Sequence, residues 1–92
     1  MRDSLATEKV LKELGRRIGR ARLAANLTQE EAAAACGIDY KRWQELEAGR
    51  VNATMRTLVR VAKGLGIGVW DLLGSAPAPE ATPRRRVRRR QT

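Results

Sequence analysis

Residues 28–49 carry the start and stop signals of two short helices joined at one glycine, and these signals constrain the fold most. Thr28 and Glu31 have the spacing of a capping box, in which the threonine oxygen accepts a hydrogen bond from an early backbone N–H and the glutamate bonds back. A helix is therefore expected from Gln29. It ends at Gly37, because glycine adopts the left-handed conformation at low cost.

The second helix of the pair follows directly. Asp39 can cap a helix that runs to about Ala48, and Gly49 closes it. Two helices joined through a single glycine must cross at close range, so the first should present small side chains at the crossing. The small residues expected there are Ala32, Ala33 and Ala35.

The second helix is predicted to have an inner and an outer face. The inner residues are Ile38, Trp43, Leu46 and Glu47, and the outer residues are Tyr40, Lys41, Gln44 and Ala48. Nine helical residues at a rise of ~1.5 Å span roughly 13 Å. That length is comparable with the ~12 Å width of the DNA major groove. The chemically crowded outer face therefore fits a groove of this kind.

A longer helix is predicted before the pair. Its apolar stripe, at the three–four spacing of one helix face, is Leu11, Leu14, Ile18, Ala21 and Ala25. This helix can begin as early as Thr7, where Leu5 and Val10 would extend the stripe. Gly15 and Gly19 weaken it as an isolated helix.

Two further helices are predicted after the pair. Thr54 can cap a helix that Gly66 ends, and Gly68 precedes a short helix over 69–73. The stripe of the first is Met55, Leu58, Val59, Ala62 and Leu65. Residues 75–83 then lose all periodicity and hold three prolines, which is typical of a linker. The prediction is an all-α fold of five short helices with a disordered basic C-terminal tail.

Composition limits the partners and the chemistry. The 92 residues suffice for one small domain, and six of the 19 basic residues lie in the run RRRVRRR at 84–90. The net charge of +9 favours nucleic acid as a partner over an anionic membrane surface. A single cysteine and no histidine leave no internal disulfide and no usual zinc set, so no metal or cofactor is expected.

Other classes of protein fit less well. The sequence shows no activated-nucleophile motif, no glycine-rich phosphate-binding loop and no paired acids in a predicted cleft. It therefore gives no indication of an enzyme. No signal peptide or membrane span is found, which favours a cytoplasmic protein.

The ordered motifs resemble the phage-repressor type of helix-turn-helix protein, the Xre-like relatives of lambda repressor and Cro. The resemblance covers about residues 14–73. The matching stretches are LGRRI at 14–18, Arg22, LTQEEAA at 27–33, CGI at 36–38, LEAG at 46–49, and LVRVAKGLGI through LL at 58–73. The resemblance implies a helix-turn-helix domain over 14–74, after an N-terminal extension of helix one at 1–13. In it, residues 29–36 position the domain and residues 39–48 form the recognition helix, which enters the major groove.

The resemblance also assigns roles to single residues. It makes Arg22 and Glu47 an internal ion pair and places Gln29 at a phosphate. With the outer face, it makes Tyr40, Lys41, Gln44 and Glu45 the candidate base contacts, although Glu45 could equally be an idle surface acid and Tyr40 could contact a phosphate, a thymine methyl or only its neighbour. The expected phosphate contacts are Thr28, Gln29, Arg42, Arg50 and Asn52, together with the tail residues Arg84, Arg85, Arg86, Arg88, Arg89 and Arg90.

Several residues depart from the family pattern. Cys36 and Ala32 stand where leucines are usual, Ala53 stands where proline is usual, and Trp43 replaces a branched aliphatic residue and can refill the missing core volume. Cys36 is expected to be a buried small hydrophobe.

The predicted function is a sequence-specific transcriptional regulator, a repressor, that binds double-stranded DNA as a homodimer on a palindromic operator in the bacterial nucleoid or a phage-infected cell. Trp70, Leu72 and Leu73 are the expected dimer interface, unless Trp70 folds back on helix one or the linker. The tail at 84–92 would neutralise phosphates. The alternative is an antitoxin-like or bridging module that holds a partner protein through its linker and tail.

Overall fold

The structure, a computed structural model, describes residues 2–74 of the chain, with the side chains of residues 5–74. It contains five helices: α1 (Arg2–Ala24), α2 (Gln29–Cys36), α3 (Tyr40–Ala48), α4 (Met55–Leu65) and α5 (Val69–Leu73). No strand occurs between residues 2 and 74, which confirms the all-α prediction. The expected linker and arginine tail lie outside the described residues.

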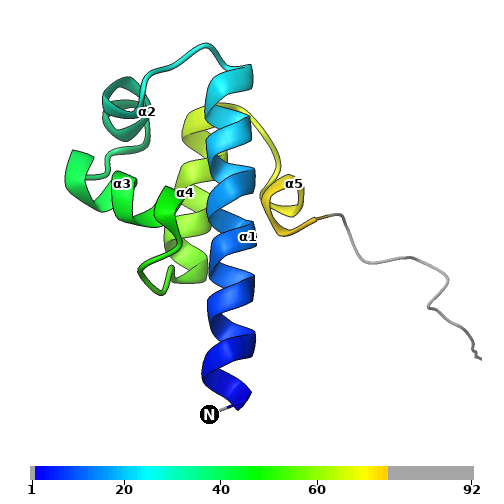
Figure 1. The fold of residues 1–92 in the computed structure, drawn as a ribbon. Coiled ribbons are helices and arrows are strands. Elements are labelled where there is room, and N and C mark those ends of the chain that lie inside the picture. The colour runs from blue at the N-terminus through cyan, green and yellow to red at the C-terminus, as the bar shows by residue number, and fades with distance from the viewer. Residues whose placement is uncertain (1, 75–92) are drawn as a thin grey trace, which may run out of the picture.

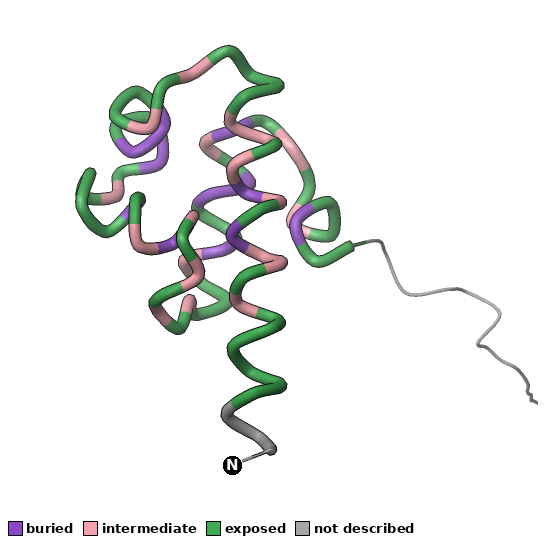
Figure 2. Tube along the Cα trace, in the orientation of Figure 1, coloured by how far each residue is buried: buried purple, intermediate pink, exposed green. Residues whose placement is uncertain are grey.

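Helix α1 is the spine of the fold, with α2 and α3 on one side and α5 on the other (Figure 1). It begins at Arg2, five residues before Thr7, and ends at Ala24. Its residues 5–10 project beyond the other helices and are exposed (Figure 2). Leu5 and Val10 are 63% and 65% exposed and do not extend the apolar stripe.

All five helices contribute buried residues to one core (Figure 2). Its fully buried large side chains are Trp43, Ile18, Leu72 and Val61. The expected burial of Trp43 and Cys36 is confirmed. Burial raises the pKa of the Cys36 thiol, whose S–H donates to the Val61 carbonyl at 3.6 Å.

The inward face of α4 differs from the predicted stripe. Val61 is buried, whereas Met55 and Val59 are 58% and 50% exposed. Apolar residues occupy both flanks of this helix, so the pattern left its rotation ambiguous by about one residue, and packing against α2 and α5 decided it.

Close helix crossings depend on glycines as well as on alanines. A Cβ at Gly15 would lie 2.4 Å from the carbonyl oxygen of Glu47, so α1 and α3 touch backbone to backbone. Gly64 brings α4 equally close to α2, where a Cβ would lie 2.9 Å from the Cα of Cys36. Ala32 and Ala33 are buried as expected, but Ala35 is exposed and only its backbone lies near the crossing.

Candidate nucleic-acid interface

The turn between α2 and α3 forms as its sequence predicted. The Thr28 hydroxyl oxygen accepts from the Glu31 N–H at 3.0 Å, and the Thr28 N–H donates to the Glu31 carboxylate at 2.9 Å, which completes the capping box. Gly37 has φ of 67°, the left-handed conformation that ends α2. Asp39 then caps α3 by accepting from the Arg42 N–H at 3.2 Å.

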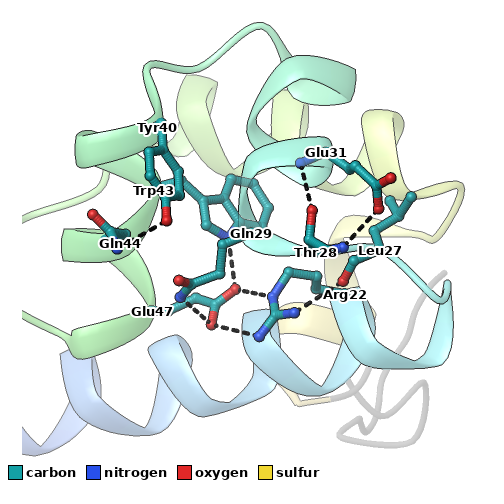
Figure 3. A network of polar contacts seen from close by, with 9 residues as sticks. All are labelled: Arg22, Leu27, Thr28, Gln29, Glu31, Tyr40, Trp43, Gln44 and Glu47. Atoms are coloured by element: carbon teal, nitrogen blue, oxygen red, sulfur yellow. Dashed lines mark hydrogen bonds and ion pairs between the residues drawn. The ribbon is translucent and has the colours of Figure 1, made fainter.

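The Glu47 carboxylate joins α3 to the two helices beside it (Figure 3). Arg22 of α1 donates from Nε to Oε2 at 2.5 Å and from Nη2 to Oε1 at 3.2 Å. Gln29 of α2 donates to Oε1 at 3.1 Å, and the Trp43 indole N–H donates to Oε2 at 2.6 Å. The carboxylate therefore accepts four hydrogen bonds from three helices.

This network is largely shielded from water. The side chains of Arg22 and Glu47 are 14% and 12% exposed, and Arg22 also donates to the Leu27 carbonyl at 2.9 Å. Burial alone would raise the pKa of Glu47. The hydrogen bonds from Arg22, Trp43 and Gln29, together with the Arg22 charge, outweigh burial and lower that pKa below its ordinary value.

Sequence reasoning placed Arg22 and Glu47 as a pair but missed the other two donors. A signal for Trp43 was present, since residues four apart lie on one helix face. For Gln29 the structure shows a Glu47 contact that the sequence could not indicate, because the residues are 18 positions apart and meet only when α2 crosses α3. The second hydrogen on the Gln29 amide nitrogen is not used in that contact.

The outer face of α3 carries the expected side chains. Tyr40, Lys41, Arg42 and Gln44 are exposed, and Glu45 is partly buried. Neither Lys41 nor Arg42 forms an ion pair within the described part of the chain. Arg50 and Asn52 are exposed in the segment between α3 and α4, and Thr28 is exposed at the start of α2. Each of these exposed side chains carries a group that can donate hydrogen bonds.

The second candidate surface is on α5. Leu72 is 1% exposed and belongs to the core, so its assignment to a dimer interface is corrected: a fully buried side chain cannot contact a second copy. Trp70 and Leu73 are 48% and 39% exposed. Leu73 lies at an open groove of about 340 Å³ between α1 and α5, whose other lining residues are Lys9, Val10, Glu13, Leu14, Arg17 and Leu72.

The described residues offer neither a metal site nor a membrane span. Residues 5–74 contain no group of three or more His, Cys, Asp or Glu side chains that could hold a metal ion. Within the same part of the chain, no helix is long and apolar enough to cross a membrane.

The sequence of this chain is similar to known helix-turn-helix proteins. A family model described as a helix-turn-helix domain matches residues 13–72. An uncharacterized HTH-type transcriptional regulator, y4dJ, from Sinorhizobium fredii is 37% identical over 62 residues, which cover 67% of this chain and 80% of that protein.

Solved structures of two other proteins have a similar fold. The restriction-modification controller protein C.AhdI from Aeromonas hydrophila is 29% identical with a TM-score of 0.66, over 67% of this chain and 94% of that one. The clp gene regulator ClgR from Corynebacterium glutamicum is 30% identical with a TM-score of 0.66, over 70% of this chain and 68% of that one. Two of these three proteins are named as regulators and the third as a controller protein. The chain belongs to the helix-turn-helix family of transcriptional regulators, in the phage-repressor-like class that its motifs resemble.

Proposed function

We propose that this protein is a sequence-specific DNA-binding repressor that inserts α3 into the major groove. The observation that carries this proposal is the anchoring of α3: Glu47 ties its inner face to α1 and α2, while Lys41 and Gln44 are exposed on its outer face. A helix whose inner face is fixed to its neighbours and whose outer face is polar can present side chains to base edges in a fixed register.

The outer face offers complementary chemistry to base edges. Lysine can donate to guanine O6 and N7, glutamine can pair with adenine, and glutamate can accept from cytosine N4. Lys41 and Gln44 are exposed and can make such contacts, whereas Glu45 is partly buried. Lys41 and Gln44 are therefore the principal base contacts in this proposal, with Glu45 and Tyr40 beside them.

Phosphate contacts flank these bases. Thr28, Gln29, Arg42, Arg50 and Asn52 offer hydroxyl, amide and guanidinium donors around α3. The hydroxyl hydrogen of Thr28 and one amide hydrogen of Gln29 remain available, because the capping box and Glu47 use other atoms. Such contacts set the position of the helix on the duplex without specifying sequence.

Assembly would use α5. Helix α5, which carries the exposed Trp70 and Leu73, lies on the side of α1 opposite to α2 and α3 (Figure 1), so a second copy can dock on α5 while both recognition helices stay free. A two-fold dimer would bind half-sites about 34–36 Å apart, and its operator would be roughly palindromic. In this proposal the bound dimer blocks transcription in a bacterial nucleoid or a phage-infected cell.

Selection of bound duplexes from a random pool tests this function. The selected duplexes should share a half-site motif, and Lys41→Ala should weaken binding to it by about 1–3 kcal/mol. Lys63→Ala is the matched control, because it removes the same charge from an exposed position on α4. Equal reductions in affinity in the two variants would show that Lys41 acts only through its charge, and a pool without a motif would refute sequence-specific binding.

A further inference from the structure

Two polar side chains on the outer face of α3, Tyr40 and Gln44, form a hydrogen bond with each other. The Gln44 amide nitrogen donates to the Tyr40 hydroxyl oxygen at 3.3 Å (Figure 3). The residues are four apart, so they lie on successive turns of the same face. Both side chains are exposed, and Tyr40 is 43% exposed.

This bond restricts what Gln44 can offer to a base. A glutamine amide has one carbonyl oxygen and two N–H groups. One hydrogen on the Gln44 nitrogen is used by Tyr40, which leaves the carbonyl oxygen and one N–H. An oxygen beside an N–H matches adenine, which presents the N6 amino donor and the N7 acceptor in the major groove.

The Gln44 amide has no second side-chain partner among the described residues. The amide of Gln29, at the start of α2, donates to Glu47 and not to Gln44. Among the described residues Tyr40 makes the one side-chain hydrogen bond to Gln44. Without it the amide could rotate about its side-chain torsions and turn over, so that oxygen and nitrogen exchange places.

We propose that Tyr40 is a positioning residue that holds the Gln44 amide in the orientation that selects adenine. The inference rests on the proposed insertion of α3 into the major groove. Tyr40 then contributes to specificity through Gln44, and its own hydroxyl hydrogen remains free to donate to water. One base pair of the half-site should depend on both residues.

Tyr40→Phe tests this proposal, because it removes only the hydroxyl from an exposed side chain. The probe is the duplex selected by the wild-type protein, with each base pair of the half-site replaced in turn. Wild-type protein should prefer adenine at one position by about 5- to 150-fold, the range of a bidentate contact. Tyr40→Phe should reduce that preference at least about fivefold, clearly more than it reduces the affinity for a scrambled duplex, with an unaltered thermal unfolding midpoint.

A double-mutant cycle separates positioning from direct contact. Gln44→Ala should abolish the same preference, and Tyr40→Phe should add nothing in that background. The preference at the position read by Lys41 should persist in Tyr40→Phe and serves as the internal control.

Three results would overturn the inference: an intact adenine preference in Tyr40→Phe, an equal reduction of affinity for all duplexes, or an additive effect in the Gln44→Ala background. An equal reduction would assign the hydroxyl to a phosphate. A wild-type protein without any preferred duplex would instead refute the proposed function, so the two failures are distinguishable.

Discussion

Glu47 shows how one residue can organise a small domain. Its carboxylate is mostly buried, which is unfavourable for a charge unless the charge is paired and hydrogen-bonded. Arg22, Gln29 and Trp43 provide these partners from three helices. Removing Glu47 would leave the Arg22 guanidinium half-satisfied, with only the Leu27 carbonyl still accepting from it.

The stability of the fold should therefore depend on Glu47 and on pH. Glu47→Gln should lower the free energy of unfolding by about 3 kcal/mol, the lower end of the range for breaking a buried pair. Because the folded pKa of Glu47 is lowered, its contribution is present above the ordinary glutamate pKa of about 4.3 and is lost as the pH falls through the folded value. Wild-type protein should thus lose more stability than Glu47→Gln on acidification.

Urea unfolding at a series of pH values measures both effects. Glu30→Gln is the matched control, since Glu30 is exposed and makes no hydrogen bond or ion pair through its side chain among the residues described. Parallel pH profiles for wild-type and Glu47→Gln protein would contradict this account of the network.

The close contact between helices α1 and α3 depends on the absence of a side chain at Gly15. Gly15 allows the C-terminal carbonyls of α3 to lie against the α1 backbone. Gly49, at φ 71°, turns the chain directly beside Lys12, where a Cβ would lie 2.8 Å from the lysine Cα. The unfavourable helix propensity of Gly15 in α1 is thereby offset by a close approach that fixes the tilt of α3.

Alanine at two positions of α1 separates helix propensity from this contact. Gly15→Ala and Gly19→Ala both gain about 1 kcal/mol of propensity. At Gly15 the new Cβ would meet backbone oxygen at 2.4 Å, whereas at Gly19 it would meet only the Glu47 carboxylate at 3.2 Å. Gly15→Ala should destabilise the fold by about 1–3 kcal/mol, and Gly19→Ala should cost clearly less. Chemical denaturation of both variants checks the order, and equal midpoints would show that α1 and α3 can separate freely.

The whole molecule keeps two surfaces apart. Helix α1 lies between the α2–α3 pair and α5, so the proposed DNA face and the exposed apolar side chains of α5 occupy different sides of the domain (Figure 1). This arrangement allows assembly and DNA binding to be tested independently.

Trp70→Ala should weaken dimer formation. The indole is about half exposed beside Leu73, and its removal would take away the largest apolar side chain exposed on α5. Analytical ultracentrifugation with and without the selected palindrome should show a reduced dimer fraction, whereas the monomer should still bind a single half-site. Leu23→Ala is the control, because Leu23 is 62% exposed on α1. Undiminished dimerisation of Trp70→Ala on DNA would exclude this interface.

The C-terminal residues 84–92 carry six arginines. Deleting residues 84–92 should weaken binding to all duplexes by a similar factor, because contacts from arginine to phosphate add affinity without reading bases. The slope of log affinity against log salt should flatten by about 0.9 for each phosphate that the tail no longer neutralises. Titrations of full-length and shortened protein against selected and scrambled duplexes measure this. An unchanged slope would assign the arginines to another partner, such as the protein expected of a bridging module.

Features governed by neighbouring residues could be predicted from the sequence alone. The capping box at Thr28, the turn at Gly37 and the cap at Asp39 are confirmed because each involves groups within a few positions of one another. The outer face of α3 followed from helical periodicity, since Trp43 and Leu46 had to point inward.

Features that depend on contacts between distant residues were decided by the tertiary structure. Val61 rather than Val59 is buried because neighbouring helices select the rotation of α4, and Leu72 belongs to the core because α5 packs against α1 and α4. Gly15 acts through the distant backbone of Glu47, and Gln29 reaches Glu47 only where α2 crosses α3. Local signals act before the chain folds, whereas the phase of a helix and the partners of a buried charge are settled by which surfaces meet.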